Sequence, residues 1–217
     1  MKRTSFFVGL ILALASSTQA ATIASWGFEV NVPSPVTGPS ISGLAPDVGS
    51  GSASGVHASS LTSFTVPVGS GSAHSLSADH WAIGDYWQFH VSTLGFQNIQ
   101  LSMDQAAAFN GVTNFNLLIS TDGTTFTTAF SNLGVPGSGG LTNVFATRTL
   151  NLSSFTQLNN ATDVYFRLSS NLPSPGTSQI DNLIVSGLAV PEPASAALLG
   201  ASAILLLLNR RRLRGNG

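Results

Sequence analysis

The sequence has no cysteine and very little charge: Asp, Glu, Lys and Arg together make up 8% of its 217 residues, and the formal net charge is -1. Without cysteine, a disulfide scaffold and a Cys-rich zinc site are excluded. The low charge excludes a broadly basic nucleic-acid surface and disorder caused by high net charge. A chain of this length has room for one ordinary domain once targeting segments are removed.

Basic residues are nearly absent from the middle of the chain. Between residues 21 and 190 only Arg148 and Arg167 are found, and lysine is missing. The same stretch contains eight carboxylates, which gives it a net charge of -6. They are Glu29, Asp47, Asp79, Asp85, Asp104, Asp122, Asp163 and Asp181. This balance disfavours binding to nucleic acid and suits divalent cations as partners.

The N-terminus has the three-part layout of a secretory signal peptide. Lys2 and Arg3 precede an uninterrupted run of apolar and small residues over 6–15, and Ala20 ends a short polar stretch. This predicts a signal helix over residues 1–20, which signal peptidase removes by cleavage between Ala20 and Ala21. A buried amphipathic helix is the alternative, and the lack of a polar period of 3.6 residues disfavours it.

The C-terminal segment, residues 189–217, combines the motif Pro191-Glu192-Pro193, an apolar run over 194–208 and an arginine-rich tail. The arginines of the tail are Arg210, Arg211, Arg212 and Arg214. The apolar run predicts a transmembrane helix of ~22 Å, and snorkelling arginines with local thinning of the bilayer make up for its shortness. Arginines retained inside the cell would leave the preceding domain outside.

These C-terminal features resemble the PEP-CTERM sorting signal of Gram-negative bacteria that make exopolysaccharide. The resemblance implies that an exosortase, an integral membrane protease-like enzyme, processes the chain near the Pro-Glu-Pro motif and releases or transfers the domain to the cell exterior. The protein is then secreted or held at the cell surface, and its anchor in the inner membrane is transient. A plain tail anchor is the alternative.

Between these two signals, apolar and polar residues alternate in short runs separated by Gly, Pro, Asn and Ser. Over residues 86–92 the alternation places Trp87, Phe89 and Val91 on one face and the polar or aromatic residues between them on the other. Such runs predict strands, and their number predicts a two-sheet antiparallel β-sandwich of jelly-roll type over residues 21–188. The segment 33–56, rich in Pro, Gly and Ser, is interpreted as a long surface excursion.

The segments Phe28-Glu29 and Ile180-Asp181-Asn182 resemble those of carbohydrate-binding modules and MAM-type domains. The resemblance implies that a glycan is a conceivable ligand and that a structural calcium lies at about this place. From the residues alone, the first and last strands of a jelly roll usually lie together, which would bring Glu29 and Asp181 close enough to share a calcium ion. The alternative is a solvated Glu29 and an Asp181 that accepts hydrogen bonds in a turn.

Two short motifs carry the densest chemistry of the domain. Asp79 and Trp81 lie in the first, and Asp85 and Trp87 in the second. Aromatic rings can stack on sugar rings while carboxylates bind the sugar hydroxyls, so both motifs are candidates for glycan contact. Exopolysaccharide is the candidate glycan. The alternative places both tryptophans in the core or at its edge and makes Asp79 a turn cap.

Sequence patterns of catalysis are not found. The chain has no Gly-x-Ser-x-Gly, no His-Glu-x-x-His, no phosphate loop and no cysteine nucleophile, so a non-enzymatic role is expected. We therefore predict an exported binding or structural component of the exopolysaccharide or biofilm matrix. The alternatives are a surface structural or adhesive protein that contacts other proteins, and a secreted glycan hydrolase that uses two of the carboxylates.

Overall fold

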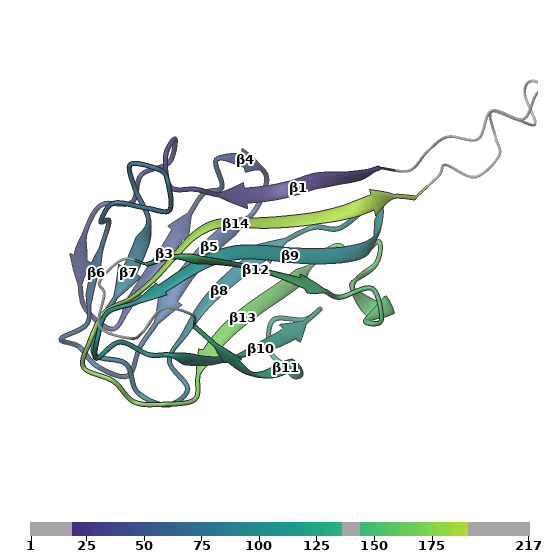
Figure 1. Ribbon diagram of the computed structural model, residues 1–217. Helices are drawn as coiled ribbons and strands as arrows, with labels where there is room; N and C mark the ends of the chain where they lie inside the picture. Colours follow the sequence, from purple (N-terminus) through teal and green to yellow (C-terminus); the bar gives the residue numbers. More distant parts are fainter. Residues whose placement is uncertain (1–18, 136–143, 191–217) are drawn as a thin grey trace, which may run out of the picture.

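The computed structural model describes residues 19–135 and 144–190, and within them the chain forms fourteen strands and one short 3-10 helix, η1 (Thr156–Leu158). All strand pairs are antiparallel and fall into two sheets that face each other (Figure 1). The predicted all-β architecture of two antiparallel sheets is therefore confirmed. The described residues form a single hydrophobic core between the two sheets, and residues 21–190 include every described strand residue apart from Ala20, the first residue of β1.

The larger sheet, sheet A, has the order β12-β9-β14-β7-β6-β2, with β1 beside β14 and β4 beside β1. Its strands are β1 (Ala20–Trp26), β2 (Val36–Thr37), β4 (Val48–Gly49), β6 (Ser63–Thr65), β7 (Leu76–Ala78), β9 (Phe96–Ala107), β12 (Ala146–Asn151) and β14 (Ser178–Ala189). The second, sheet B, has the order β11-β10-β13-β8-β5-β3. Its strands are β3 (Ser40–Leu44), β5 (Ser52–Val56), β8 (Tyr86–Val91), β10 (Asn114–Ser120), β11 (Thr127–Gly134) and β13 (Val164–Ser170).

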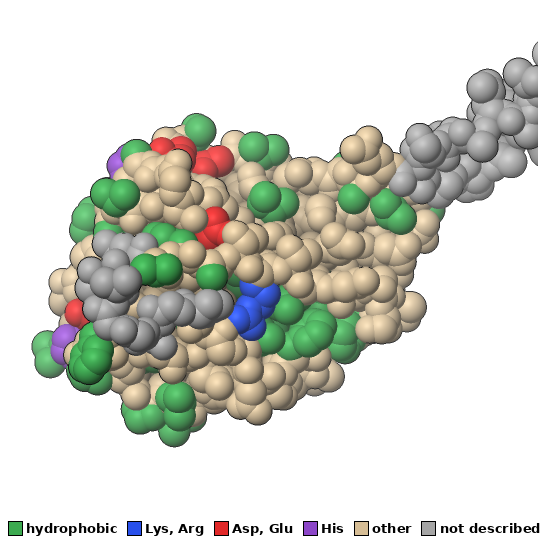
Figure 2. All heavy atoms as spheres, in the orientation of Figure 1, with side chains coloured by type: hydrophobic (Ala, Val, Ile, Leu, Met, Phe, Trp, Pro, Cys, Tyr) green, Lys and Arg blue, Asp and Glu red, His purple; other side chains and the backbone are tan. Residues whose placement is uncertain are grey.

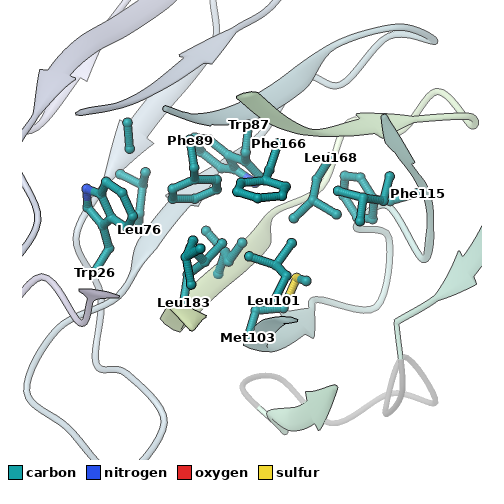
Figure 3. Close-up of a cluster of buried hydrophobic side chains, with 14 of the residues drawn as sticks. Trp26, Leu76, Trp87, Phe89, Leu101, Met103, Phe115, Phe166, Leu168 and Leu183 are labelled. Carbon is teal, nitrogen blue, oxygen red and sulfur yellow. The ribbon is translucent and has the colours of Figure 1, made fainter. Parts of the chain in front are cut away.

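The core lies between the sheets and follows from the alternation in sequence. Trp87, Phe89 and Val91 of β8 are all buried, as their period of two predicts. Figure 3 shows side chains of sheet B, among them Phe89 and Phe166, facing side chains that come from sheet A. Burial of these apolar side chains is the main free-energy gain of folding for a chain that has no cysteine to crosslink.

The first and last strands pair with each other, as predicted for a jelly roll. Ala20 of β1 lies opposite Leu188 of β14, and the two strands run antiparallel with one bulge (Figure 1). The predicted cleavage point between Ala20 and Ala21 thus falls at the first bond of β1. The chain enters and leaves the sandwich at the same end.

The interpretation of residues 33–56 as a surface excursion is wrong. This segment contributes β3 and β5 to sheet B and buries Ile41, Leu44 and Ala53. Its small residues have a packing reason: a Cβ atom at Gly55 would lie 2.6 Å from Cζ3 of Trp87. The strand can pass over the indole only because the residue there has no side chain.

The predicted signal helix and the predicted transmembrane helix over 194–208 lie outside the described residues, apart from Gln19 and Ala20. The sorting-signal residues Pro191, Glu192, Pro193 and the tail arginines lie outside them as well. Within residues 19–135 and 144–190, no helix has the length and apolar character needed to cross a bilayer.

Candidate functional site on the outer face of sheet B

The two central strands of sheet B carry their large polar side chains on the face turned away from the core. Because Trp87 and Phe89 point inward, the alternation of β8 turns Tyr86, Gln88 and His90 outward, and all three are half-buried. The neighbouring strand β13 contributes Tyr165 and Arg167 to the same face. The sequence predicted the two faces of β8 correctly, and the structure adds the partners from β13.

Register pairs His90 with Tyr165 across the two strands. The residues lie directly opposite each other, and their rings stack with centroids 4.3 Å apart and planes inclined by 13°. His90 Nε2 also lies 2.9 Å from Oδ1 of Asp163, and this hydrogen bond is the main reason that the pKa of Asp163 is lowered. The stack fixes the two half-buried rings in one orientation on the outer face of sheet B.

Arg167 lies two pairs further along β13, opposite Gln88. Its Nε and Nη2 donate hydrogen bonds of 3.1 and 2.7 Å to Oε1 of Gln88. The guanidinium carbon is 3.9 Å from the ring centroid of Tyr86 and 3.7 Å from that of Phe126, so the cation is held by two aromatic rings. Partial burial lowers the pKa of Arg167, which stays far above neutral pH as for any arginine.

Small polar groups surround these side chains on the flanking strands. Ser52 and Ser54 of β5 lie opposite His90 and Gln88. On the other side, Asn116 of β10 lies opposite Ser169 of β13. The outer face of sheet B therefore offers aromatic rings, one fixed cation, amides and hydroxyls side by side.

The predicted glycan-contact tryptophans are placed differently. Trp87 is 1% exposed and Trp81 is 3% exposed, and the two rings pack against each other at 5.4 Å. The indole N–H of Trp81 donates to the carbonyl of Ala78. Neither ring face is open to a sugar in this arrangement, which corrects the expected role of both residues and matches the alternative that places them in the core.

The two acids of those motifs hold loops together. Asp85 is buried and accepts hydrogen bonds from the backbone N–H groups of Ala58 and Ala82. Asp79 accepts one from the N–H of Ser63. Both carboxylates accept backbone N–H groups that have no carbonyl partner at the turns, so their oxygens are engaged in the fold.

His57 is the buried centre of this region. Its Nδ1 lies 3.4 Å from Oδ2 of Asp85 and 3.3 Å from the hydroxyl of Thr62, and its ring is 4.2 Å from that of Trp81. Burial lowers the pKa of His57, and the nearby Asp85 opposes that shift. The imidazole is therefore neutral near pH 7 and serves as a packed polar core group.

Among the described residues, two hollows on the border of the sandwich stand out. One, of about 270 Å³, lies at the tight turn after β10, where Ser120, Asp122, Thr125 and Thr127 are among its lining residues. The carboxylate of Asp122 accepts the N–H groups of Thr124 and Thr125, which lower its pKa strongly. The other, of about 400 Å³, is a shallow depression beside Trp81, lined mainly by Pro173, Pro175 and their neighbours.

The predicted calcium ligands, Glu29 and Asp181, both lie near the loop 66–75 of sheet A. Asp181 is fully buried, and its oxygens accept the N–H groups of Ser70 and Asn182 and the hydroxyl of Ser72. Glu29 accepts the N–H of His74, a residue of that same loop. The structure thus brings both carboxylates to the loop 66–75, and no contact between them is recorded among the described residues.

Two more acids stand close to this position. Asp104 lies opposite Asp181 in the pairing of β9 with β14, and its Oδ2 accepts a hydrogen bond from the amide of Asn182. Burial raises the pKa of Asp181, and the charge of Asp104 raises it further. Asp47 binds four backbone N–H groups of residues 27–31, which lower its pKa although burial alone would raise it. Figure 2 shows acidic side chains gathered at the upper left of the molecule.

This cluster partly fits a calcium ion. Its carboxylate, amide and carbonyl oxygens are the hard donors that calcium prefers, and the sequence places no lysine or arginine among them. However, no three His, Asp or Glu residues of the described chain converge on one point. Backbone and amide oxygens would have to complete the coordination shell, so calcium remains a proposal that chelation can test.

Comparison with known proteins gives similarities of structure only. No family model matches the chain, and no curated protein matches it in sequence. Among solved structures, the K3 cleaved adhesin domain of Lys-gingipain from Porphyromonas gingivalis has a TM-score of 0.45 at 12% identity, covering 77% of this chain and 99% of that one.

Two carbohydrate-binding modules are also similar. The family 11 module of the cellulosomal cellulase Lic26A-Cel5E of Clostridium thermocellum has a TM-score of 0.40 at 15% identity, covering 82% of this chain and 100% of that one. TmCBM61, solved with beta-1,4-galactotriose, has a TM-score of 0.42 at 8% identity, covering 73% and 92%. Carbohydrate-binding modules are one of the two classes that the sequence resemblance named, and at such identities and TM-scores none of these neighbours carries a residue role or ligand over to this chain.

Proposed function

We propose that this protein is an exported, non-enzymatic binding module of the exopolysaccharide matrix, and that it binds glycan on the outer face of sheet B. The observation that carries the proposal is the fixed, half-buried set of Tyr86, His90, Tyr165 and Arg167 on two central strands. Rings and forked donors held by their neighbours lose little conformational entropy on binding, which favours recognition of a polymer rich in hydroxyl groups.

Export is the second part of the proposal and rests on the sequence. The signal peptide over 1–20 and the PEP-CTERM segment 189–217 would take the domain through the inner membrane, with exosortase acting near Pro191-Glu192-Pro193. The intact mass of extracellular protein should then lack at least residues 198–217. Full-length protein retained in the inner membrane would contradict this route.

The test of binding is co-sedimentation of purified residues 21–190 with the exopolysaccharide of the producing cell. We expect saturable binding that Tyr165→Ala weakens about tenfold, because a central contact residue is removed. Phe109→Ala is the matched control, since Phe109 is an aromatic residue 78% exposed at a distant loop. Absence of saturable binding by the unmodified domain, or equal losses in both variants, would contradict the assignment of this face.

A second candidate function is contact with other proteins. The loops at the end of the sandwich away from the termini expose Leu61, Ile83, Phe109 and Leu172. Backbone hydrogen bonds between these loops, such as Gly84 N–H to the carbonyl of Ser170, keep them together. Exposed apolar groups at one end would suit self-association between copies of this chain. A strictly monomeric mass in sedimentation at high concentration would reject it.

A further inference from the structure

The guanidinium of Arg167 is enclosed on both of its flat sides. Tyr86 comes from β8 and Phe126 from the turn that leads into β11, and these elements lie on opposite sides of β13 in sheet B. The two rings therefore approach the cation from opposite directions. A ligand can reach this group only in the plane of the guanidinium, along one of its edges.

One of the two donor edges is already engaged. Nε and Nη2 both donate to Oε1 of Gln88, which fixes the rotation of the fork. Within the described part of the chain, no hydrogen bond is recorded for Nη1. The end of the fork, formed by Nη1 and Nη2, thus presents two parallel N–H donors, the geometry that binds a carboxylate in bidentate fashion.

The charge of Arg167 has no carboxylate partner among the described residues. Every ion pair of the described chain involves a histidine. The acids at the ends of the surrounding strands are engaged elsewhere: Asp163 binds His90, Asp122 binds the N–H groups of its own turn, and the buried Asp85 accepts from Ala58 and Ala82. A half-buried cation without a counter-charge pays a desolvation cost that an anionic ligand would offset.

The surroundings of Arg167 are neutral rather than basic. The other arginine of the domain, Arg148, lies on β12 of sheet A and donates to the carbonyl of Gly134. Around Arg167 stand serine hydroxyls, amides and aromatic rings. One cation in a field of neutral hydrogen-bonding groups complements a chain of hydroxyl groups with sparse carboxylates better than a densely acidic peptide.

We propose that the glycan bound by this face is an acidic polysaccharide, whose uronate carboxylate pairs with the free end of the Arg167 fork while neighbouring sugar hydroxyls bind the polar groups of β5, β8 and β10. The inference rests on the proposed glycan-binding function and specifies the class of polymer. It also gives Arg167 a role in binding anions, although the domain as a whole has a net negative charge.

The experiment uses residues 21–190 and matched pairs of polymers in affinity electrophoresis. Each pair contains one acidic polymer, polygalacturonate or alginate, and the same polymer with its carboxylates esterified or reduced. Poly-glutamate serves as an acidic polymer without sugar. The variants are Arg167→Gln, Arg167→Lys, which keeps the charge and loses the fork, and Arg148→Gln, which removes the same charge from sheet A.

We expect the acidic member of at least one pair to bind about tenfold more tightly than its neutral form, because the neutral form lacks one charge-assisted bidentate contact. Arg167→Gln and Arg167→Lys should each remove that preference while leaving the weaker binding of the neutral form, and Arg148→Gln should change neither. Thermal melts of all variants show whether each is folded.

The outcomes separate the inference from the function on which it rests. Equal binding of both members of every pair, or a preference that survives in Arg167→Gln, overturns the acidic-polymer inference and leaves glycan binding intact. Binding of poly-glutamate with the same dependence on Arg167 overturns the choice of a polysaccharide. Binding to no polymer of either kind, including the exopolysaccharide of the producing cell, contradicts the proposed function itself.

Discussion

The outer faces of the two sheets use their charged groups in opposite ways. On sheet A, the buried Asp181 is covered by the loop 66–75 and surrounded by N–H and O–H donors of the chain itself. On sheet B, Arg167 is fixed by its neighbours but keeps one edge without a recorded partner among the described residues. The buried carboxylate on sheet A is therefore engaged as a hydrogen-bond acceptor within the fold, whereas the cation on sheet B keeps donors for the ligand that we propose.

The largest expected effect is on sheet A. Asp181→Ala leaves the N–H groups of Ser70 and Asn182 and the hydroxyl of Ser72 without their acceptor, and we expect the free energy of unfolding in urea to fall by about 3 kcal/mol. Glycan binding of the folded fraction should be unchanged. A loss of binding with normal stability would break the distinction between the two faces.

Removal of calcium should act on the same face with a somewhat smaller effect. If a cation neutralises the cluster of Asp181 and Asp104, then chelation lowers the melting temperature of residues 21–190. The corresponding loss in the free energy of unfolding is about 2.7 kcal/mol when calcium had been present at 100 times its Kd. Asp181→Ala should abolish that sensitivity. An unchanged melt in chelator would show that hydrogen bonds alone hold the loop, and the calcium proposal would fall.

Tyr165→Ala on sheet B should give the reverse pattern. The residue is half-buried and outside the core, so we expect a loss of stability of about 1 kcal/mol with a roughly tenfold loss of glycan affinity. Urea titration and co-sedimentation on the same sample measure both. A stability loss like that of Asp181→Ala would mean that the stack of Tyr165 on His90 is chiefly structural.

The smallest expected effect is a difference in pH response, measured in chelator. Burial raises the pKa of Asp181, so its contribution to stability is present below its ordinary value of 3.8 and is lost as pH rises through the folded-state pKa. The His90 hydrogen bond lowers the pKa of Asp163, so that contribution is present above 3.8 and is lost as pH falls through the lower pKa.

Two variants isolate these responses. Asp181→Asn should flatten the fall in stability on the alkaline side of pH 3.8, and Asp163→Asn should flatten the fall on the acid side. Urea titrations across the acid range provide the measurement. Identical pH profiles for both variants would mean that the two faces are not electrostatically distinct.

Much of the fold could be predicted because a strand alternates with a period of two. The inward set of Trp87, Phe89 and Val91 was readable directly, and the pairing of the first and last strands followed from the expected jelly roll. The segment 33–56 misled because small residues usually mark loops. In this protein Gly55 is small because Trp87 lies beneath it, a contact between distant strands that no local pattern reveals.

The candidate site was only half visible in the sequence. The outward face of β8 could be read, but the sandwich of Tyr86, Arg167 and Phe126 joins side chains from three separate segments. Its one signal was that Arg167 is one of two arginines in the whole domain. The sequence instead favoured Trp81 and Trp87, which are aromatic residues close to acids. The alternation of β8, however, already predicted that Trp87 points into the core.

The position of β14 has a mechanical consequence. This strand is flanked on one side by β9 along most of its length and on the other by β7 and then β1. A pull on the chain beyond Ala189, while the polymer is held at the opposite sheet, is directed along the strand. It must shear hydrogen bonds to neighbours on both sides at once, where an edge strand would peel away bond by bond. If the C-terminal end is attached and sheet B holds the polymer that we propose, the domain would transmit tension between the two without unravelling from the tethered end.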